Sequence, residues 1–127
     1  MSGCKRQCKG CFNQEAWDPK SGKVFNEEAK QKLFAELEHS WCRGLSILGG
    51  EPMSVLSDNR QQVIALAREA KAKFPAKDIW LWTSYTLEEL QADSSTKEVL
   101  ELVDVLVDGP FVLEKRDASL AFRGSSN

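Results

Sequence analysis

The stretch Gly44-Leu-Ser-Ile-Leu-Gly-Gly-Glu-Pro52 predicts a short apolar strand, residues 44–48, that ends in a glycine turn. Two similar strands are expected further along the chain, over residues 78–83 (Asp-Ile-Trp-Leu-Trp-Thr) and residues 104–108 (Asp-Val-Leu-Val-Asp). In residues 78–83, two tryptophans alternate with aliphatic residues, which is typical of a strand buried on both faces.

Two longer helical patterns lie before the first strand and between the first two. Asn26 is expected to cap the first helix, whose apolar face reaches Trp41. Asp58, with Gln61 three residues later, predicts a capping box at the start of the second helix. Pro75 cannot continue that helix and marks its end.

Two shorter helices are expected before the third strand. Thr86 with Glu89 predicts another capping box, and a further helical stretch runs from about residue 96 to residue 103. Residues 1–23 and 114–127 predict loops. Strands that alternate with helices indicate an α/β fold with a parallel sheet and right-handed crossovers. Sites in such folds lie at the carboxyl ends of the strands.

The composition is that of an ordinary globular chain of 127 residues, with 42% hydrophobic and 28% charged residues. This length suits a single domain, residues 1–127. The formal net charge of -2 offers no basic surface for nucleic acid. No apolar run approaches the roughly 20 residues of a membrane span, and the polar start lacks the apolar segment of a signal peptide. We therefore expect a cytoplasmic protein with neither a nucleic-acid nor a membrane partner.

Three of the four cysteines lie in the stretch Cys4-Lys-Arg-Gln-Cys8-Lys-Gly-Cys11, which has a C-x3-C-x2-C spacing. In a cytosolic chain such a group more often holds metal or does redox chemistry than forms disulfides. Three thiolates can hold a cuboidal 4Fe–4S cluster and leave its fourth iron without a protein ligand, free to bind a substrate. The alternative is a zinc site in which Cys42 or His39 is the fourth ligand.

The same spacing is the signature of the radical S-adenosylmethionine superfamily, and Gly49-Gly50-Glu51-Pro52 resembles the GGE motif of that superfamily. Taken alone, this second motif could be a plain turn after a strand. Blocks along nearly the whole chain resemble the anaerobic (class III) ribonucleotide reductase activating proteins: residues 8–13, 17–18, 79–86, 104–111 and 122–127.

The resemblance implies a partial (β/α) barrel of mostly parallel strands, of the radical S-adenosylmethionine type. Members of that family usually begin with a further strand ahead of the first cysteine and continue beyond the block that ends here at Asn127. The resemblance therefore implies a chain that is short at both ends, lacks the N-terminal strand and leaves one sheet edge unpaired.

The resemblance also implies an activity and its partners. Cys4, Cys8 and Cys11 would hold a 4Fe–4S cluster whose open iron binds S-adenosylmethionine. Reductive cleavage, with an electron from a reduced flavodoxin-like donor, would give a 5′-deoxyadenosyl radical. That radical would take a hydrogen atom from a glycine of the large subunit of the anaerobic ribonucleotide reductase. The protein itself would supply positioning and shielding.

Further residues are expected, by the same resemblance, to contact S-adenosylmethionine. Gly49 and Gly50 would let backbone groups approach the methionine amine, and Glu51 would add a hydrogen bond. Thr83 and Ser84 follow the second strand, where a ribose hydroxyl could be met.

Other residues of the family-like blocks carry weaker expectations. Phe12, beside the third cysteine, would pack near the adenine, although an aromatic residue there is often only core. A substrate-facing role is a hypothesis for Arg123 and Ser125, and Asp108 either lines the rim of the site or forms a turn.

Two kinds of alternative function remain: an enzyme with a different substrate, and a protein that binds metal without catalysing a reaction. Within the enzymes, the alternatives are an activase of another glycyl-radical enzyme and a radical enzyme that acts on a small molecule. Outside the enzymes, the alternative is a non-catalytic metal-binding module with cysteine ligands, which predicts tight zinc binding and loss of metal on Cys42→Ala.

Overall fold

The structure is a computed structural model that describes residues 1–55 and 58–127. Its sheet contains three parallel strands in the order β1 (Gly44–Ile47), β2 (Asp78–Trp82) and β3 (Val105–Val107). Leu81 of β2 pairs with Ile47 on one side and with Leu106 on the other. The α/β class and the parallel sheet are confirmed, and the partial barrel stays a prediction.

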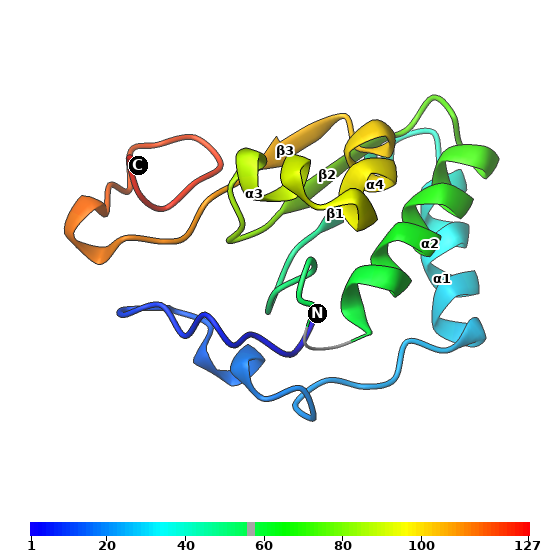
Figure 1. Ribbon diagram of the computed structural model, residues 1–127. Helices are drawn as coiled ribbons and strands as arrows, with labels where there is room; N and C mark the ends of the chain where they lie inside the picture. The colour runs from blue at the N-terminus through cyan, green and yellow to red at the C-terminus, as the bar shows by residue number, and fades with distance from the viewer. Residues whose placement is uncertain (56–57) are drawn as a thin grey trace.

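Within the described residues, four α-helices form between and before the strands: α1 (Glu27–Glu38), α2 (Asn59–Lys73), α3 (Leu87–Ala92) and α4 (Lys97–Leu102). Figure 1 shows α1 and α2 side by side, and ion pairs such as Lys30 with Glu69 join them. Among the described residues, no helix is long and apolar enough to cross a membrane.

The helices bury one face of the sheet. Ile79 and Leu81 point into this layer and are 1% and 0% exposed. They belong to a cluster with apolar residues of all four helices, among them Leu37, Val63 and Val99. Burial of this face holds the strands in register, so that their carboxyl ends reach one edge of the sheet.

The opposite face of β2 differs from the prediction of a strand buried on both faces. Trp80 and Trp82 are only half-buried, because no helix in the described part of the chain covers their side. The C-terminal segment contacts them instead: the rings of Trp80 and Phe122 lie 4.9 Å apart, and Trp82 Nε1 donates to the Phe122 carbonyl at 2.8 Å. This half-covered face borders the cavity described below.

Two of the three expected helix caps form. The Asn26 side chain accepts a hydrogen bond from the Ala29 amide at 2.9 Å, and Thr86 and Glu89 make the complete capping box. Asp58 directly precedes α2, as predicted, but its capping box does not form. Its backbone (φ -72°, ψ -1°) is already helical, so its side chain does not reach the free amides of the first turn.

Two boundary predictions also need correction. Helix α1 ends before Trp41, because His39 is extended at φ -63°, ψ 136°. Trp41 is therefore 73% exposed and stacks on His39 instead of continuing the apolar face. In the tail, which was expected to be all loop, Leu113–Lys115 form a short 3-10 helix and Arg116 makes an isolated bridge with Ser125.

Arg60 anchors the loop that follows β1. Its guanidinium is buried and donates twice to the Met53 carbonyl, at 2.9 and 2.7 Å. It also donates to Ser95 Oγ at 2.8 Å and to the Asp93 carboxylate. Hydrogen bonds first from Ser95 and then from Arg60 lower the pKa of Asp93 to about 2. Arg60 thereby joins the strand-end loop to the segment after α3.

Replacing this side chain is expected to destabilise the fold. Arg60→Ala leaves the buried Met53 carbonyl without its donors, and should lower the free energy of unfolding by about 2–3 kcal/mol. Urea titration of the cluster-free chain, followed by circular dichroism, measures the change. Arg68→Ala is the matched control, because Arg68 only pairs with Glu98 on the surface. Equal effects of the two variants would contradict this role.

Candidate functional site

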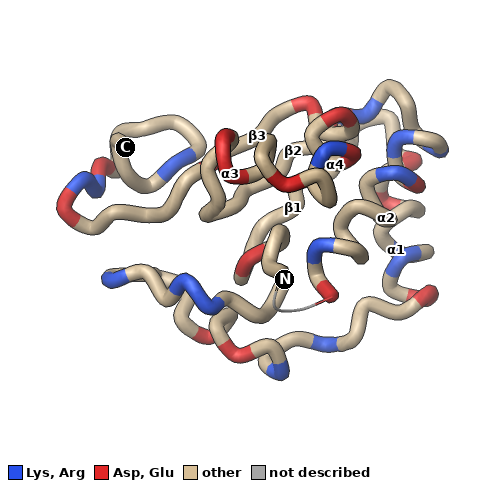
Figure 2. Tube along the Cα trace, viewed as in Figure 1, with Lys and Arg blue, Asp and Glu red and all other residues tan. Residues whose placement is uncertain are grey.

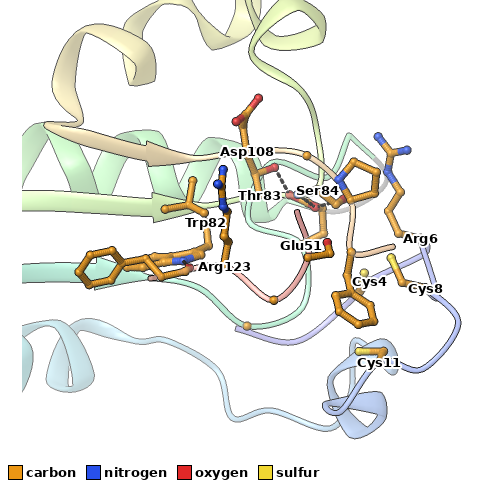
Figure 3. A pocket seen from close by; sticks show the side chains of 18 of the residues that line it. Cys4, Arg6, Cys8, Cys11, Glu51, Trp82, Thr83, Ser84, Asp108 and Arg123 are labelled. Carbon is orange, nitrogen blue, oxygen red and sulfur yellow. Dashed lines mark hydrogen bonds between the residues drawn. The ribbon is translucent and has the colours of Figure 1, made fainter. Parts of the chain in front are cut away.

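A cavity of about 550 Å³ lies at the carboxyl ends of the strands. Its walls come from four parts of the chain that are far apart in sequence: the cysteine loop, the turn after β1, the ends of β2 and β3, and the C-terminal segment. Figure 3 shows side chains from each part around the same space. The expected convergence of strand ends on one rim is therefore confirmed.

All three cysteines of the motif border this cavity. Cys4, Cys8 and Cys11 are free thiols and half-buried. The loop that carries them turns sharply, since the Cys11 amide donates to the Cys8 carbonyl at 3.1 Å. Gly10 supports this turn with φ +76°, and a Cβ there would lie 2.8 Å from Leu113 Cδ1. Gly10 is therefore needed for the tight turn of this loop.

The donor set suits a cluster better than a single ion. Within residues 1–55 and 58–127, no three His, Cys, Asp or Glu side chains lie close enough to bind one metal ion. A single zinc ion would need its sulfur ligands about 2.3 Å from one centre. A 4Fe–4S cluster instead takes each thiolate on a different iron, which fits three cysteines spaced around a cavity.

The proposed fourth zinc ligands lie elsewhere. Cys42 and His39 precede β1, at the opposite end of the strand from the cavity, and neither borders it. Cys42 packs against the core, as expected, and its thiol donates to the Gly44 carbonyl at 3.7 Å. His39 stacks on Trp41. The structure therefore does not support a zinc site completed by either residue.

The two glycines of the turn after β1 accommodate the start of the chain. Gly49 has φ +122°, and a Cβ there would lie 2.1 Å from the Met1 nitrogen. A Cβ on Gly50 would lie 2.7 Å from the Gly3 carbonyl oxygen. The Gly50 amide donates to the Met1 carbonyl at 2.8 Å, and the Glu51 amide donates to the Gly3 carbonyl at 2.9 Å. These contacts place the cysteine loop beside the turn, and contact with a methionine amine stays a prediction.

Glu51, Thr83 and Ser84 come together, as the sequence suggested, but they bind one another. The Glu51 carboxylate is 3% exposed and accepts hydrogen bonds from Thr83 Oγ1 at 2.6 Å and the Met53 amide at 3.0 Å. It also accepts from the Ser84 amide at 2.8 Å and from the Ser84 hydroxyl. A carboxylate has about four acceptor positions. Glu51 therefore links the end of β1 to the end of β2, and its predicted contact with S-adenosylmethionine is not tested.

The remaining predicted residues divide between cavity and surface. Phe12 is 99% exposed and is not part of the cavity wall, so that its role beside an adenine stays a prediction. Arg123 borders the cavity, and so does Ser125, whose hydroxyl accepts from the Val112 amide at 3.1 Å. Asp108 lines the cavity, as one of its two expectations had it, and its carboxylate accepts from the Leu87 amide at the start of α3 at 2.8 Å.

Several aromatic residues of the cavity wall were not predicted. Trp80 and Trp82 were expected in the core, and Trp17 and Phe122 were not given a site role. Strand alternation could have found the first two, because it separates them from Ile79 and its neighbours on the helix-covered face. The sequence carries no comparable signal that Phe122 would fold back against Trp80.

Comparison with known proteins places the chain in a family. The model of the 4Fe–4S single cluster domain family matches residues 1–127. Three relatives, each called anaerobic ribonucleoside-triphosphate reductase-activating protein, come from Vibrio cholerae, Escherichia coli K12 and Enterobacteria phage T4. They are 46%, 38% and 35% identical to this chain. Each match covers 100% of this chain and 81%, 81% and 77% of the relative, respectively. The chain belongs to the anaerobic ribonucleoside-triphosphate reductase-activating protein family. No solved structure matches it.

Membership in this family confirms the resemblance to anaerobic ribonucleotide reductase activating proteins that the sequence motifs indicated. It also confirms the assignment of a 4Fe–4S cluster domain, because the family model spans the cysteine loop and the cavity wall together. The same match favours an iron–sulfur cluster over zinc at the cysteine loop, and the non-catalytic alternative stays a prediction.

The central hydrogen-bonding role of Glu51 can be tested by neutralising it. Glu51→Gln places an amide group against hydroxyl and backbone donors, and should lower the free energy of unfolding by about 2–3 kcal/mol. Urea titration of the cluster-free chain measures the change. Glu98→Gln is the control, because Glu98 only pairs with Arg68 on the surface. A Glu51 variant as stable as this control would show that the carboxylate does not join the strands.

Proposed function

We propose that this chain activates the anaerobic ribonucleoside-triphosphate reductase by cleaving S-adenosylmethionine and generating a glycyl radical on the reductase large subunit. The observation that carries the proposal is that all three cysteines of the C-x3-C-x2-C motif border one cavity, together with the Gly49–Glu51 turn. The names of the relatives supply the partner.

The cysteine side chains would hold the cofactor. Cys4, Cys8 and Cys11 offer three thiolates for four irons, which leaves one iron open for the amine and carboxylate of S-adenosylmethionine. When bound, the reduced cluster supplies the electron that splits the sulfonium C–S bond, giving methionine and a 5′-deoxyadenosyl radical. A reduced flavodoxin-like protein is the proposed source of that electron.

The cavity would hold S-adenosylmethionine. Its volume of about 550 Å³ lies within the usual range for small-molecule sites. We propose that the turn at Gly49 and Gly50 meets the methionine end, with Glu51 holding that turn in place. Thr83 and Ser84 would lie near the ribose, at the end of β2.

The aromatic wall would shield the radical chemistry. Trp80, Trp82 and Phe122 form a continuous aromatic group on the sheet face of the cavity. Such a wall excludes water without offering a titratable group. Phe12 lies outside the cavity and would reach an adenine only after the cysteine loop moves.

The substrate would be a protein segment, not a small molecule. The cavity is partly open to solvent, and its walls include the cysteine loop and the C-terminal segment, so that a large partner could cover it. The glycine that receives the radical would approach through this opening. We further propose that residues 1–127 act as one domain in the cytoplasm.

Anaerobic reconstitution with iron and sulfide, followed by reduction in the presence of S-adenosylmethionine, tests the proposal. The expected product is 5′-deoxyadenosine, together with a glycyl-radical signal when the anaerobic reductase is present. A formate-lyase type enzyme serves as the control substrate and should give no such signal. Product formation with the control but not with the reductase would assign the chain to another glycyl-radical enzyme.

Cysteine variants separate the cluster ligands from the remaining cysteine. Cys8→Ala should reduce 5′-deoxyadenosine formation to background, because it removes one of three iron ligands. Cys42→Ala should retain both cluster and product, since Cys42 lies away from the cavity. Iron analysis and chromatography of the product measure both. Loss of metal in Cys42→Ala, or tight zinc in the parent chain, would overturn the assignment.

A further inference from the structure

Arg6 lies inside the cysteine motif, between Cys4 and Cys8, and joins it to a helix far along the chain. Its Nη2 lies 3.3 Å from Glu89 Oε2, on α3. Its guanidinium carbon also lies 4.9 Å from the centre of the Tyr85 ring. In Figure 3 the Arg6 guanidinium points away from the sulfur atoms, so its contacts are with α3 and not with the cysteines.

The α3 side of this contact is already fixed. Glu89 belongs to the capping box, in which its carboxylate accepts from the Thr86 amide at 2.7 Å and its amide donates to Thr86 Oγ1 at 3.2 Å. Tyr85 faces a second cation, since the guanidinium carbon of the buried Arg60 lies 5.7 Å from its ring centre. Arg6 therefore meets a surface whose groups other contacts hold in place.

The cysteine loop, unlike α3, contains a residue in an unfavourable backbone conformation that needs stabilising contacts. Gln7, next to Arg6, has φ +46°, a backbone conformation that residues other than glycine rarely adopt. Such a residue persists where its surroundings hold it. Before this residue, the Cys4 amide donates to the Trp17 carbonyl at 3.2 Å, and Arg6 supplies the contact of this loop that reaches α3.

The other two cations of the loop make weaker contacts, although all three lie along it in Figure 2. Lys9 lies 4.0 Å from Glu114, and both side chains are largely exposed. Lys5 makes no ion pair with any residue that the structure describes. Arg6, with a side chain 35% exposed, is therefore distinguished from its neighbours by geometry and not by charge.

We infer that Arg6 is a positioning residue for the cluster: it holds the first half of the cysteine loop against α3 and so keeps Cys4 and Cys8 at the cavity. This inference deepens the proposed function, because it assumes that these cysteines bind the cluster. It assigns Arg6 no contact with S-adenosylmethionine or with the reacting atoms.

Cluster retention in the reconstituted chain is the first test. Arg6→Ala should lose the visible absorbance of the cluster about fivefold to tenfold faster than the parent in excess chelator, as expected for one cation–π contact and one ion pair. Lys5→Ala and Lys9→Ala remove the same charge from the same loop and should behave like the parent. Arg6→Lys, which keeps the charge near Glu89, should restore part of the retention. Equal loss rates in Arg6→Ala and Lys5→Ala would overturn the inference.

Amide hydrogen exchange of the cluster-free chain is the second test and does not depend on the proposed function. Exchange should be faster in Arg6→Ala than in Lys5→Ala over residues 4–11 and over the first turn of α3. Glu89→Gln, which keeps an acceptor for the Thr86 amide, should give the same change if Arg6→Ala does not fold. Unchanged exchange would reject the inference even if the cluster forms. A parent chain without a cluster, but with the expected exchange, would reject only the proposed function.

Discussion

The carboxylate of Glu51 is the interaction on which the site depends. It lies in the turn after β1 and accepts four hydrogen bonds, three of them from groups at the end of β2. The two glycines before it admit the backbone of Met1 and Gly3, which leads directly into the cysteine loop. The Glu51 side chain thus joins the ends of β1 and β2, and the backbone amides of Gly50 and Glu51 join this turn to the segment that leads into the cysteine loop. A misplaced Glu51 would shift three walls of the cavity together.

The two faces of the sheet differ in what covers them: helices pack on one face, and the other face borders the cavity. The helix-covered face, centred on Ile79 and Leu81, is closed and apolar. The other face carries Trp80 and Trp82, which no helix covers and which the C-terminal segment reaches through Phe122. This asymmetry explains why the cavity is aromatic on its sheet side and bordered by thiols on the other. It also explains why chain segments at both ends contribute to one site.

Much of this arrangement could be predicted from local patterns, and the rest depends on contacts distant in sequence. Strand positions and the Thr86 cap follow from alternation and capping chemistry, and both are present. Asp58 with Gln61 shows the same kind of sequence pattern, but the Asp58 side chain makes no capping hydrogen bond. Its backbone is helical, whereas that of Thr86 is extended. The reason for two glycines after β1 could not be read from the sequence, since it depends on the approach of Met1 and Gly3. The cysteine spacing singled out three residues that border the cavity, but the ion pair of Arg6 depends on the fold.

The central claim is that three thiolates leave one iron of the cluster open to S-adenosylmethionine. Electron–nuclear double resonance of the reduced cluster, with S-adenosylmethionine labelled at its amine nitrogen and carboxylate oxygen, tests it most directly. The account predicts hyperfine coupling of both labels to the cluster, and unchanged coupling in Cys42→Ala. A cluster whose fourth iron is bound by a protein side chain, with no coupling to either label, would contradict it.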